Sequence, residues 1–482
     1  MSKILNLASM LRDKKISCVE LTEEYLCAAK RLNPELNAYI SITEDVALKS
    51  AAEADKKFST SDNFPPLLGI PFILKDNIAT AGLKTTCASK MLENHVPIYD
   101  AAVWESLKEQ GAVLIGKGNM DEMGMGSNGE SSHFGQSLNP YDTSYIAGGS
   151  SGGVAAAVAS GTAVYGIGTD TGGSIRQPAS LCGLVGLKPT YGTVSRYGLF
   201  ALASSLDQVG PIAITALDAA IVFDVISTRD KRDMQSLGMK PVLPSLTGDI
   251  QGMRIGVVRE FYDNLAPDIS KAVQNALDTF EKMGATLVDL RFPLLNYGLA
   301  VYYILSCAEA ASNLGRFDGI RYGYRTDQYN NIEELISKTR SEGFGESAKR
   351  RVMLGTYLLS AEHHDMYYIK ALKLKNAIKN EYKRIFNECD CLVTPTLHTT
   401  AVKVGASRGA EEQKDDINNV TANIAGLPAV SIPCGFDEEG FPVGLQIIGD
   451  KFCDDIVLNT AHAFETKTAG EFLRVSESGV RL

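Results

Sequence analysis

Histidine is scarce in this sequence, and none of its six histidines lies between His133 and His363. A serine nucleophile served by a histidine would therefore need a base from a distant part of the chain. The nine cysteines form no C-x-x-C pair and no Cys/His cluster with zinc spacing. We therefore expect reduced thiols and no metal site.

Long lipid-like hydrophobic runs are also missing, because the longest apolar stretches are rich in small residues. The first residues, MSKILNLASMLRDKK, lack the basic end, apolar stretch and cleavage site of a signal peptide. These absences predict a cytoplasmic protein with no membrane segment.

Positive charge is in deficit, since 57 acidic residues against 47 basic ones give a formal net charge of −10. Binding a phosphate backbone requires a clustered basic face, so we expect this chain to touch nucleic acid little. The P-loop motif G-x-x-x-x-G-K-[ST] is absent as well, so nothing in the sequence supports ATP binding by this chain.

The segments that are present alternate between helix and strand patterns, which predicts an α/β fold with a mixed central sheet flanked by helices. We expect a helix in ISCVELTEEYLCAAKRLNPEL, capped by Ser17 and ended before Pro34, and a buried strand that ends near Lys75. Further strands are expected in MRIGVV, CDCLVTPT, AVSIPCG and PVGLQIIG, and a long helix is expected from about Tyr368 to Asn387.

Strand patterns occur on both sides of a helical middle, so we expect residues 1–482 to form one domain with an interrupted sheet. Its expected parts are a helical N-terminal region (1–60), a core with the motifs (65–215), a mostly helical insertion or cap (227–390) and a return to the sheet (391–482).

Glycine-rich motifs in the core resemble known catalytic turns but match them incompletely. GGSSGG, residues 148–153, fits the G-x-S-x-G nucleophile elbow, yet LNPYDTSYIA before it has the pattern of a turn instead of the buried strand that the elbow requires. DTGG from Asp170 fits the aspartic-protease turn, but no second copy exists. Taken singly, each motif is more typical of simple turn formation.

Ser174 lies in the glycine-rich stretch GIGTDTGGSIRQPAS, and a lysine can replace histidine as the base of a serine. Such a lysine must be neutral and therefore buried in apolar surroundings. Lys75 fits because it ends the run IPFIL. The adjacent Asp76 would favour the charged form if it pointed the same way, although successive strand residues point to opposite faces.

Three motifs together resemble the signature of the amidase signature family: LKDNI around Lys75, GGSSGG around Ser150 and GTDTGGSIRQPAS around Ser174. Their separations of 75 and 24 residues also fit the family, and the similarity extends over essentially the whole chain. The resemblance implies the amidase signature fold and a Ser-Ser-Lys mechanism. In that mechanism Ser174 is the nucleophile, Ser150 relays its proton and Lys75 is the base.

The same resemblance implies two features of the backbone around these serines. A cis peptide is expected between Gly149 and Ser150. The backbone N–H groups of Thr171, Gly172 and Gly173 are expected to form an oxyanion hole, where the two glycines let the backbone approach the developing charge closely.

Within the family, TTCASKML, NMDEMGMGSN and SEGFGESAKRRVMLGTY resemble the glutaminase subunits of tRNA-dependent amidotransferases. This resemblance implies a chain that releases ammonia from glutamine and works with partner subunits B and C. ATP and Mg²⁺ are expected in the partner, with no cofactor in this chain. The partner would bind tRNA and amidate Glu-tRNA(Gln), with Asp-tRNA(Asn) left open as a second substrate.

The resemblance also implies a glutamine pocket. Arg351 would bind the α-carboxylate, for which a guanidinium is suited, Asp416 would bind the α-ammonium, and Tyr302 would line the pocket. Arg350 and Tyr303 remain alternatives to their neighbours, and Asp416 could instead cap a helix.

Two other functions compete with this interpretation: a stand-alone amidase of the same family acting on other small amides, and a non-catalytic scaffold. The charged pair Arg351 and Asp416 favours glutamine, and the intact Lys75 and serines argue against a scaffold. The sequence departs from the family at Asn419, where related chains usually carry threonine or a similar residue.

Overall fold

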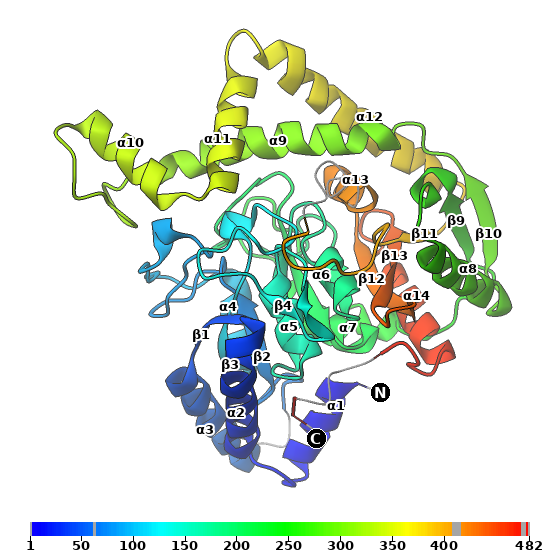
Figure 1. Ribbon diagram of the computed structural model, residues 1–482. Coiled ribbons are helices and arrows are strands. Elements are labelled where there is room, and N and C mark those ends of the chain that lie inside the picture. Colours follow the sequence, from blue (N-terminus) through cyan, green and yellow to red (C-terminus); the bar gives the residue numbers. More distant parts are fainter. Residues whose placement is uncertain (1, 61–63, 407–415, 474–478, 481–482) are drawn as a thin grey trace.

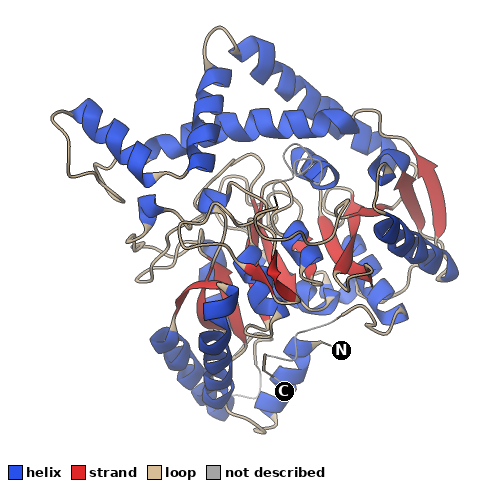
Figure 2. Cartoon of the chain, in the orientation of Figure 1, coloured by secondary structure: helices blue, strands red, loops and turns tan. Residues whose placement is uncertain are grey.

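One mixed β-sheet of eleven strands organises the chain (Figure 2). The structure is a computed structural model that describes residues 2–60, 64–406, 416–473 and 479–480. In their order across the sheet the strands are β1 (Tyr39–Ile42), β3 (Val113–Gly118), β2 (Pro71–Lys75), β6 (Tyr165–Asp170), β8 (Gln208–Ala213), β7 (Val185–Lys188), β12 (Ala429–Phe436), β13 (Pro442–Gly449), β11 (Cys391–Pro395), β9 (Arg254–Val258) and β10 (Thr286–Leu290).

Both pairing modes occur in this sheet, which confirms the predicted α/β fold with a mixed sheet. The strands pair in parallel in two groups, β3–β2–β6 and β11–β9–β10. The strands between these groups pair antiparallel. Parallel pairs need long crossover connections, which the intervening helices provide.

Helices pack against the sheet and above it (Figure 1). They are α1 (Lys3–Arg12), α2 (Cys18–Leu36), α3 (Glu44–Thr60), α4 (Ala102–Gln110), α5 (Gly152–Ala159), α6 (Arg176–Leu181), α7 (Ala216–Ile226), α8 (Pro267–Lys282), α9 (Gly298–Asn313), α10 (Ile332–Gly343), α11 (Glu346–Leu359), α12 (Ile369–Phe386), α13 (Ile417–Ala425) and α14 (Asp454–Lys467). Among the residues that the structure describes, no helix is both long and apolar enough to cross a lipid bilayer.

The predicted start of α2 is confirmed and its predicted end is wrong. Ser17 caps the helix, and its side chain and that of Glu20 bond reciprocally in a capping box. Pro34 lies inside the last turn, and the helix ends at Asn37 in a left-handed conformation. Proline has no backbone N–H to donate, so the helix runs two residues beyond Pro34 with one hydrogen bond fewer.

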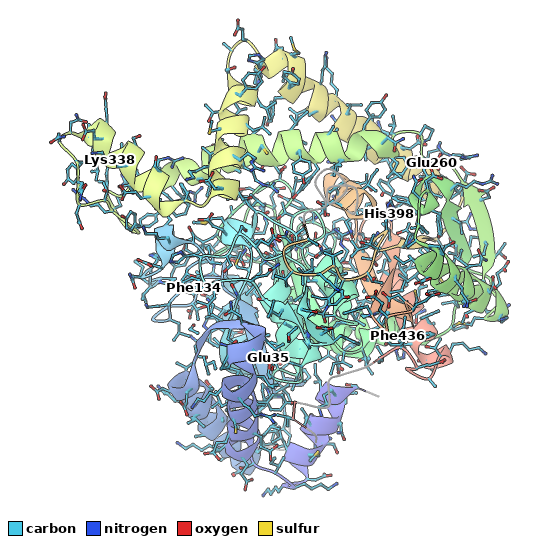
Figure 3. All side chains as sticks on the ribbon, in the orientation of Figure 1. Glu35, Phe134, Glu260, Lys338, His398 and Phe436 are labelled. Atoms are coloured by element: carbon cyan, nitrogen blue, oxygen red, sulfur yellow. The ribbon has the colours of Figure 1, made fainter. Side chains whose placement is uncertain are left out.

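A layer of long helices covers the centre of the sheet. Helix α9 runs across the upper part of Figure 1, α11 and α12 pack against it at an angle, and α13 lies beneath it. They share a hydrophobic core that is separate from the main core around the sheet. Side chains fill the space between this layer and the sheet (Figure 3). Region 227–390 supplies the layer, and it also contributes β9 and β10 to the sheet.

The segment before GGSSGG contains strand where a turn was predicted. A separate two-stranded sheet pairs β4 (Leu138–Asn139) with β5 (Asp142–Ile146). The alternating polar residues of β5 leave much of it exposed, so it is not the buried strand of a nucleophile elbow.

Candidate active site

Lys75 ends β2, and its side chain is completely buried. Its ammonium nitrogen Nζ lies 2.7 Å from Ser150 Oγ, 2.8 Å from Ser151 Oγ and 3.3 Å from the carbonyl oxygen of Thr169. The structure therefore brings Lys75 and Ser150 together as the sequence predicts. The hydroxyl of Ser151 is a second hydrogen-bond partner of the same lysine. The sequence analysis did not assign it a role, although Ser151 is adjacent to Ser150 in GGSSGG.

Burial lowers the pKa of Lys75 to about 7. The carboxylates of Asp121, Asp170 and Asp207 act in the opposite direction, because negative charge nearby favours the ammonium. A lysine with this pKa is substantially neutral near pH 7, as a base must be.

Asp76 points away from Lys75, so it does not hold that lysine in its charged form. Its carboxylate accepts hydrogen bonds from the backbone N–H of Thr86 at 2.8 Å and from Thr86 Oγ1 at 2.5 Å. It also forms a buried ion pair with Lys117 at 3.5 Å. The alternation of side chains at the end of a strand explains why two adjacent charges face different surroundings.

Ser174 is partly exposed, while every other residue from Gly166 to Ser180 is buried. The Ser151 N–H donates to the backbone oxygen of Ser174 at 3.2 Å, which ties this turn to the GGSSGG turn. The predicted cis peptide is present between Gly149 and Ser150. No hydrogen bond joins Ser174 Oγ to another described residue, so the link from Ser150 to Ser174 remains a prediction.

The oxyanion hole differs in part from the prediction. The Gly173 N–H already donates to Asp170 Oδ1 at 2.8 Å, because the turn folds back over that carboxylate. The N–H groups of Thr171 and Gly172 donate no hydrogen bond to any other described residue. The hydroxyl of Thr171 donates to the buried Asp207 at 2.7 Å, and this hydrogen bond anchors the loop.

An ion pair that the sequence analysis missed supports the nucleophile turn. Arg176 and Asp170 are both fully buried, and the guanidinium donates two hydrogen bonds of 3.0 Å to the carboxylate. Burial alone would raise the pKa of Asp170, but the charge of Arg176 lowers it well below its usual range. Asp170 also accepts the backbone N–H of Ile175 at 3.2 Å, so the pair holds both sides of Ser174. The six-residue spacing in DTGGSIR was the available signal.

The predicted pocket residues Tyr302 and Arg351 converge on the same loop. A Cβ atom added to Gly172 would lie 2.8 Å from Tyr302 Oη, so Tyr302 packs against the oxyanion loop. Burial raises the pKa of Tyr302, the Arg351 guanidinium lowers it, and the Asp416 carboxylate raises it. These electrostatic effects place all three predicted residues in one neighbourhood.

The structure distinguishes each of these residues from its neighbour in the sequence. Arg350 is exposed on α11, whereas Arg351 Nη1 is buried and forms no hydrogen bond with a described residue. Tyr303 lies under the guanidinium of Arg351, 5.4 Å from ring centre to guanidinium carbon, and does not occupy the position of Tyr302. A buried unpaired donor of this kind suits an anionic ligand.

Asp416 stands at the N-cap position of α13 but makes no side-chain capping hydrogen bond there. It also lines a cleft with Gln177, whose side chain accepts the Gly149 N–H at 2.8 Å. Asn419, where the sequence departs from the family, is buried in α13 and packs against Gly173. Its Nδ2 donates to the backbone oxygen of Thr396 at 2.9 Å.

A metal centre has no support in the part of the chain that the structure describes. No group of three or more His, Cys, Asp or Glu side chains there could hold a metal ion. All nine cysteines are free, and seven of them are buried.

Comparison with known sequences gives the same assignment as the motifs. The amidase family profile matches residues 20–458. The chain is 49% identical to the A subunit of glutamyl-tRNA(Gln) amidotransferase from Thermoanaerobacter pseudethanolicus, across 96% of this chain and 95% of the relative. It is 47% identical to the protein of that name from Sulfurihydrogenibium sp., across 95% of this chain and 96% of the relative.

Solved structures share the fold over nearly the full length. The crystal structure of the corresponding glutamyl-tRNA(Gln) amidotransferase protein from Thermotoga maritima matches with a TM-score of 0.79 at 39% identity and covers 94% of each chain. A peptide amidase from Stenotrophomonas maltophilia matches with a TM-score of 0.82 at 28% identity, over 97% of this chain and 96% of the other. The chain therefore belongs to the amidase family and, within it, to the A subunits of glutamyl-tRNA(Gln) amidotransferases.

Proposed function

We propose that this chain is the cytoplasmic, glutamine-hydrolysing subunit of a glutamyl-tRNA(Gln) amidotransferase. It supplies ammonia to partner subunits B and C, where ATP and Mg²⁺ act and Glu-tRNA(Gln) is amidated. The names of the similar A subunits support the partnership. The observation that carries the substrate assignment is Arg351, a half-buried cation whose buried Nη1 has no partner among the described residues and which acts electrostatically on Tyr302.

In the first half of the reaction, Ser174 Oγ attacks the side-chain amide carbon of glutamine. Its proton passes through Ser150 Oγ to Lys75 Nζ, along the 2.7 Å hydrogen bond between the last two groups. The amide oxygen becomes an oxyanion that the N–H groups of Thr171 and Gly172 stabilise, each such donor contributing about 3 kcal/mol.

The carbon–nitrogen bond then breaks, and the nitrogen takes the proton back from Lys75 through Ser150 and leaves as ammonia. The product on the enzyme is a glutamyl ester of Ser174. Water attacks this ester by the same proton route and releases glutamate and free Ser174.

The pocket selects glutamine by its two charges. Arg351 binds the α-carboxylate, and Asp416 binds the α-ammonium; both charges act on Tyr302. An amide without these groups would leave the Arg351 guanidinium unpaired in a buried site, which costs free energy. This argument favours glutamine over the small neutral amides of a stand-alone amidase.

The test measures ammonia released from glutamine by the chain in complex with its partner subunits. Ser174→Ala is expected to lower the rate by about 10⁴-fold or more, because it removes the nucleophile. Arg351→Ala is expected to raise KM for glutamine about 100-fold, because two charged hydrogen bonds are lost.

Both variants should still use added ammonium chloride for tRNA amidation, which serves as the control for folding and assembly. Undiminished glutaminase activity in Ser174→Ala would refute the mechanism. Higher activity on a neutral small amide than on glutamine would instead support the stand-alone amidase.

A further inference from the structure

The loop from Asn119 to Gly126 follows β3 and contacts the catalytic serines on one side. The Asp121 N–H donates to the backbone oxygen of Ser150 at 3.3 Å. A Cβ atom added to Gly124 would lie 3.8 Å from Ser150 Oγ. This loop is therefore part of the wall beside the proposed proton relay.

The other side of the loop holds the beginning of α11. Both carboxylate oxygens of Glu122 accept the backbone N–H of Gly345, at 3.1 and 2.9 Å. Ser347 Oγ donates to the Met125 carbonyl oxygen at 2.9 Å. Glu122 is 2% exposed, and Ser89 Oγ donates to it at 2.6 Å. The contact is thus buried, and one carboxylate accepts hydrogen bonds from both Gly345 and Ser89.

Gly345 is the N-cap residue of α11 and has no side chain to satisfy the free N–H groups of the first turn. Glu122 supplies a carboxylate from another segment, at the end of the helix where negative charge is favourable. A Cβ atom on Gly345 would lie 2.6 Å from Glu122 Oε2, so any larger residue at this position would displace the carboxylate. Glu122 therefore fixes where α11 begins relative to the loop.

Arg351 lies six residues after Gly345 on the same helix, so the position of its guanidinium depends on where α11 begins. We infer that Glu122 is a positioning residue for glutamine: it holds Arg351 at the correct distance from Ser150 and Ser174. The inference rests on the proposed function of Arg351. Glu122 itself touches no reacting group in this scheme and acts only through α11.

The test is the kinetics of glutamine hydrolysis by Glu122→Ala in complex with the partner subunits. KM for glutamine is expected to rise about tenfold, as for a lost hydrogen bond to a charged group, while kcat changes less than about twofold. Amidation with ammonium chloride should be unchanged. In the double variant Glu122→Ala/Arg351→Ala, KM should equal that of Arg351→Ala alone, because both changes act through one contact.

Glu346→Ala is the matched control. Glu346 is an acid in the first turn of α11, but its side chain is 84% exposed. It should leave KM unchanged. Glu122→Gln keeps one acceptor oxygen and should give an intermediate KM, and it replaces the alanine variant if that variant does not assemble.

An unchanged KM in Glu122→Ala and Glu122→Gln would overturn the inference, as would effects that add fully to those of Arg351→Ala. A failure of the proposed function looks different. In that case Arg351→Ala itself would leave KM for glutamine unchanged, or the parent complex would release no ammonia from glutamine.

Discussion

At the scale of single residues, the proposed mechanism depends on one lysine, Lys75, whose charge is controlled by burial. Lys75 lies among two serine hydroxyls and a backbone carbonyl, and three carboxylates act on it from a greater distance. Burial is the larger effect and lowers its pKa. The balance between burial and these charges sets the pH range in which the base is available.

This balance predicts the pH dependence of glutamine hydrolysis. Since burial lowers the pKa of Lys75 to about 7 and the neutral form is the base, kcat/KM should rise as the pH increases through about 7. Asp121→Asn removes a negative charge that raises this pKa, so the inflection should move to lower pH. The measurement is a pH–rate profile of ammonia release.

Glu130→Gln serves as the control, because Glu130 is an exposed acid of the same segment and does not act on Lys75. Its profile should match that of the parent. An inflection that stays in place, or moves upward, in Asp121→Asn would show that Lys75 is not the titrating base.

At the scale of secondary structure elements, the pocket is a product of helix packing. Tyr302 lies on α9 and Arg351 on α11, and the two helices meet at Gly355. A Cβ atom on Gly355 would lie 1.9 Å from the carbonyl oxygen of Cys307. Only glycine permits this separation of the helix axes, so the distance between Tyr302 and Arg351 depends on it.

Gly355→Ala is therefore expected to push α11 away from α9. The free energy of unfolding should fall by about 1–3 kcal/mol through overpacking, although alanine favours an isolated helix by about 1 kcal/mol over glycine. KM for glutamine should rise because Arg351 moves with α11. Urea denaturation and steady-state kinetics measure the two effects.

The control is Gly315→Ala, where an added Cβ meets no atom within 4 Å. It should leave both quantities unchanged or slightly raise stability. A Gly355→Ala variant that is as stable as the parent would contradict the close packing.

At the scale of the whole molecule, segments from opposite ends of the chain meet on α7. Both carboxylate oxygens of Glu465, on α14, accept the Ala216 N–H at 3.0 and 2.9 Å. Asp218, two residues further in the first turn of α7, accepts Ser2 Oγ at 2.5 Å and the Ile4 N–H at 3.1 Å. Glu465 of α14 thus binds the N-terminus of α7, and Asp218 of α7 binds the N-terminus of α1, so two buried acids connect the three helices.

Burial raises the pKa of Glu465 to about 8, whereas an unfolded glutamate titrates near pH 4.3, an approximate reference value. Between these values the folded chain keeps a proton that the unfolded chain releases. The contribution of Glu465 to stability is therefore full below the unfolded pKa and is lost as the pH rises through about 8.

Glu465→Gln removes this titration. The parent should therefore lose more of its free energy of unfolding than the variant does when the pH rises from about 6 to about 8.5. Urea denaturation at the two pH values measures the difference. The control is Glu471→Gln, because Glu471 is exposed. Its free energy of unfolding should equal that of the parent at both pH values. An equal response in the Glu465 and Glu471 variants would contradict the buried titration.

The sequence by itself predicted much of the architecture and the family, and it named Lys75, Ser150 and Ser174 for the proposed mechanism. Hydrophobic patterning indicated the α/β class, the strand that ends at Lys75, and the helix that Ser17 caps. These features are local, because periodicity and capping depend on residues a few positions apart. The motifs around Lys75, Ser150 and Ser174 identified the family, because their combination and spacing are specific.

Contacts between distant segments were decided only by the tertiary structure. The contact of Glu122 with Gly345 joins residues 223 positions apart, and the contact of Arg176 with Asn423 joins residues 247 positions apart, so neither follows from a single segment. The pKa of Lys75 belongs to the same class, because burial and the charges around it come from segments up to 132 residues away, at Asp207. Residue types and their local order determined which groups could react, and long-range packing determined which of them meet and in what charge state.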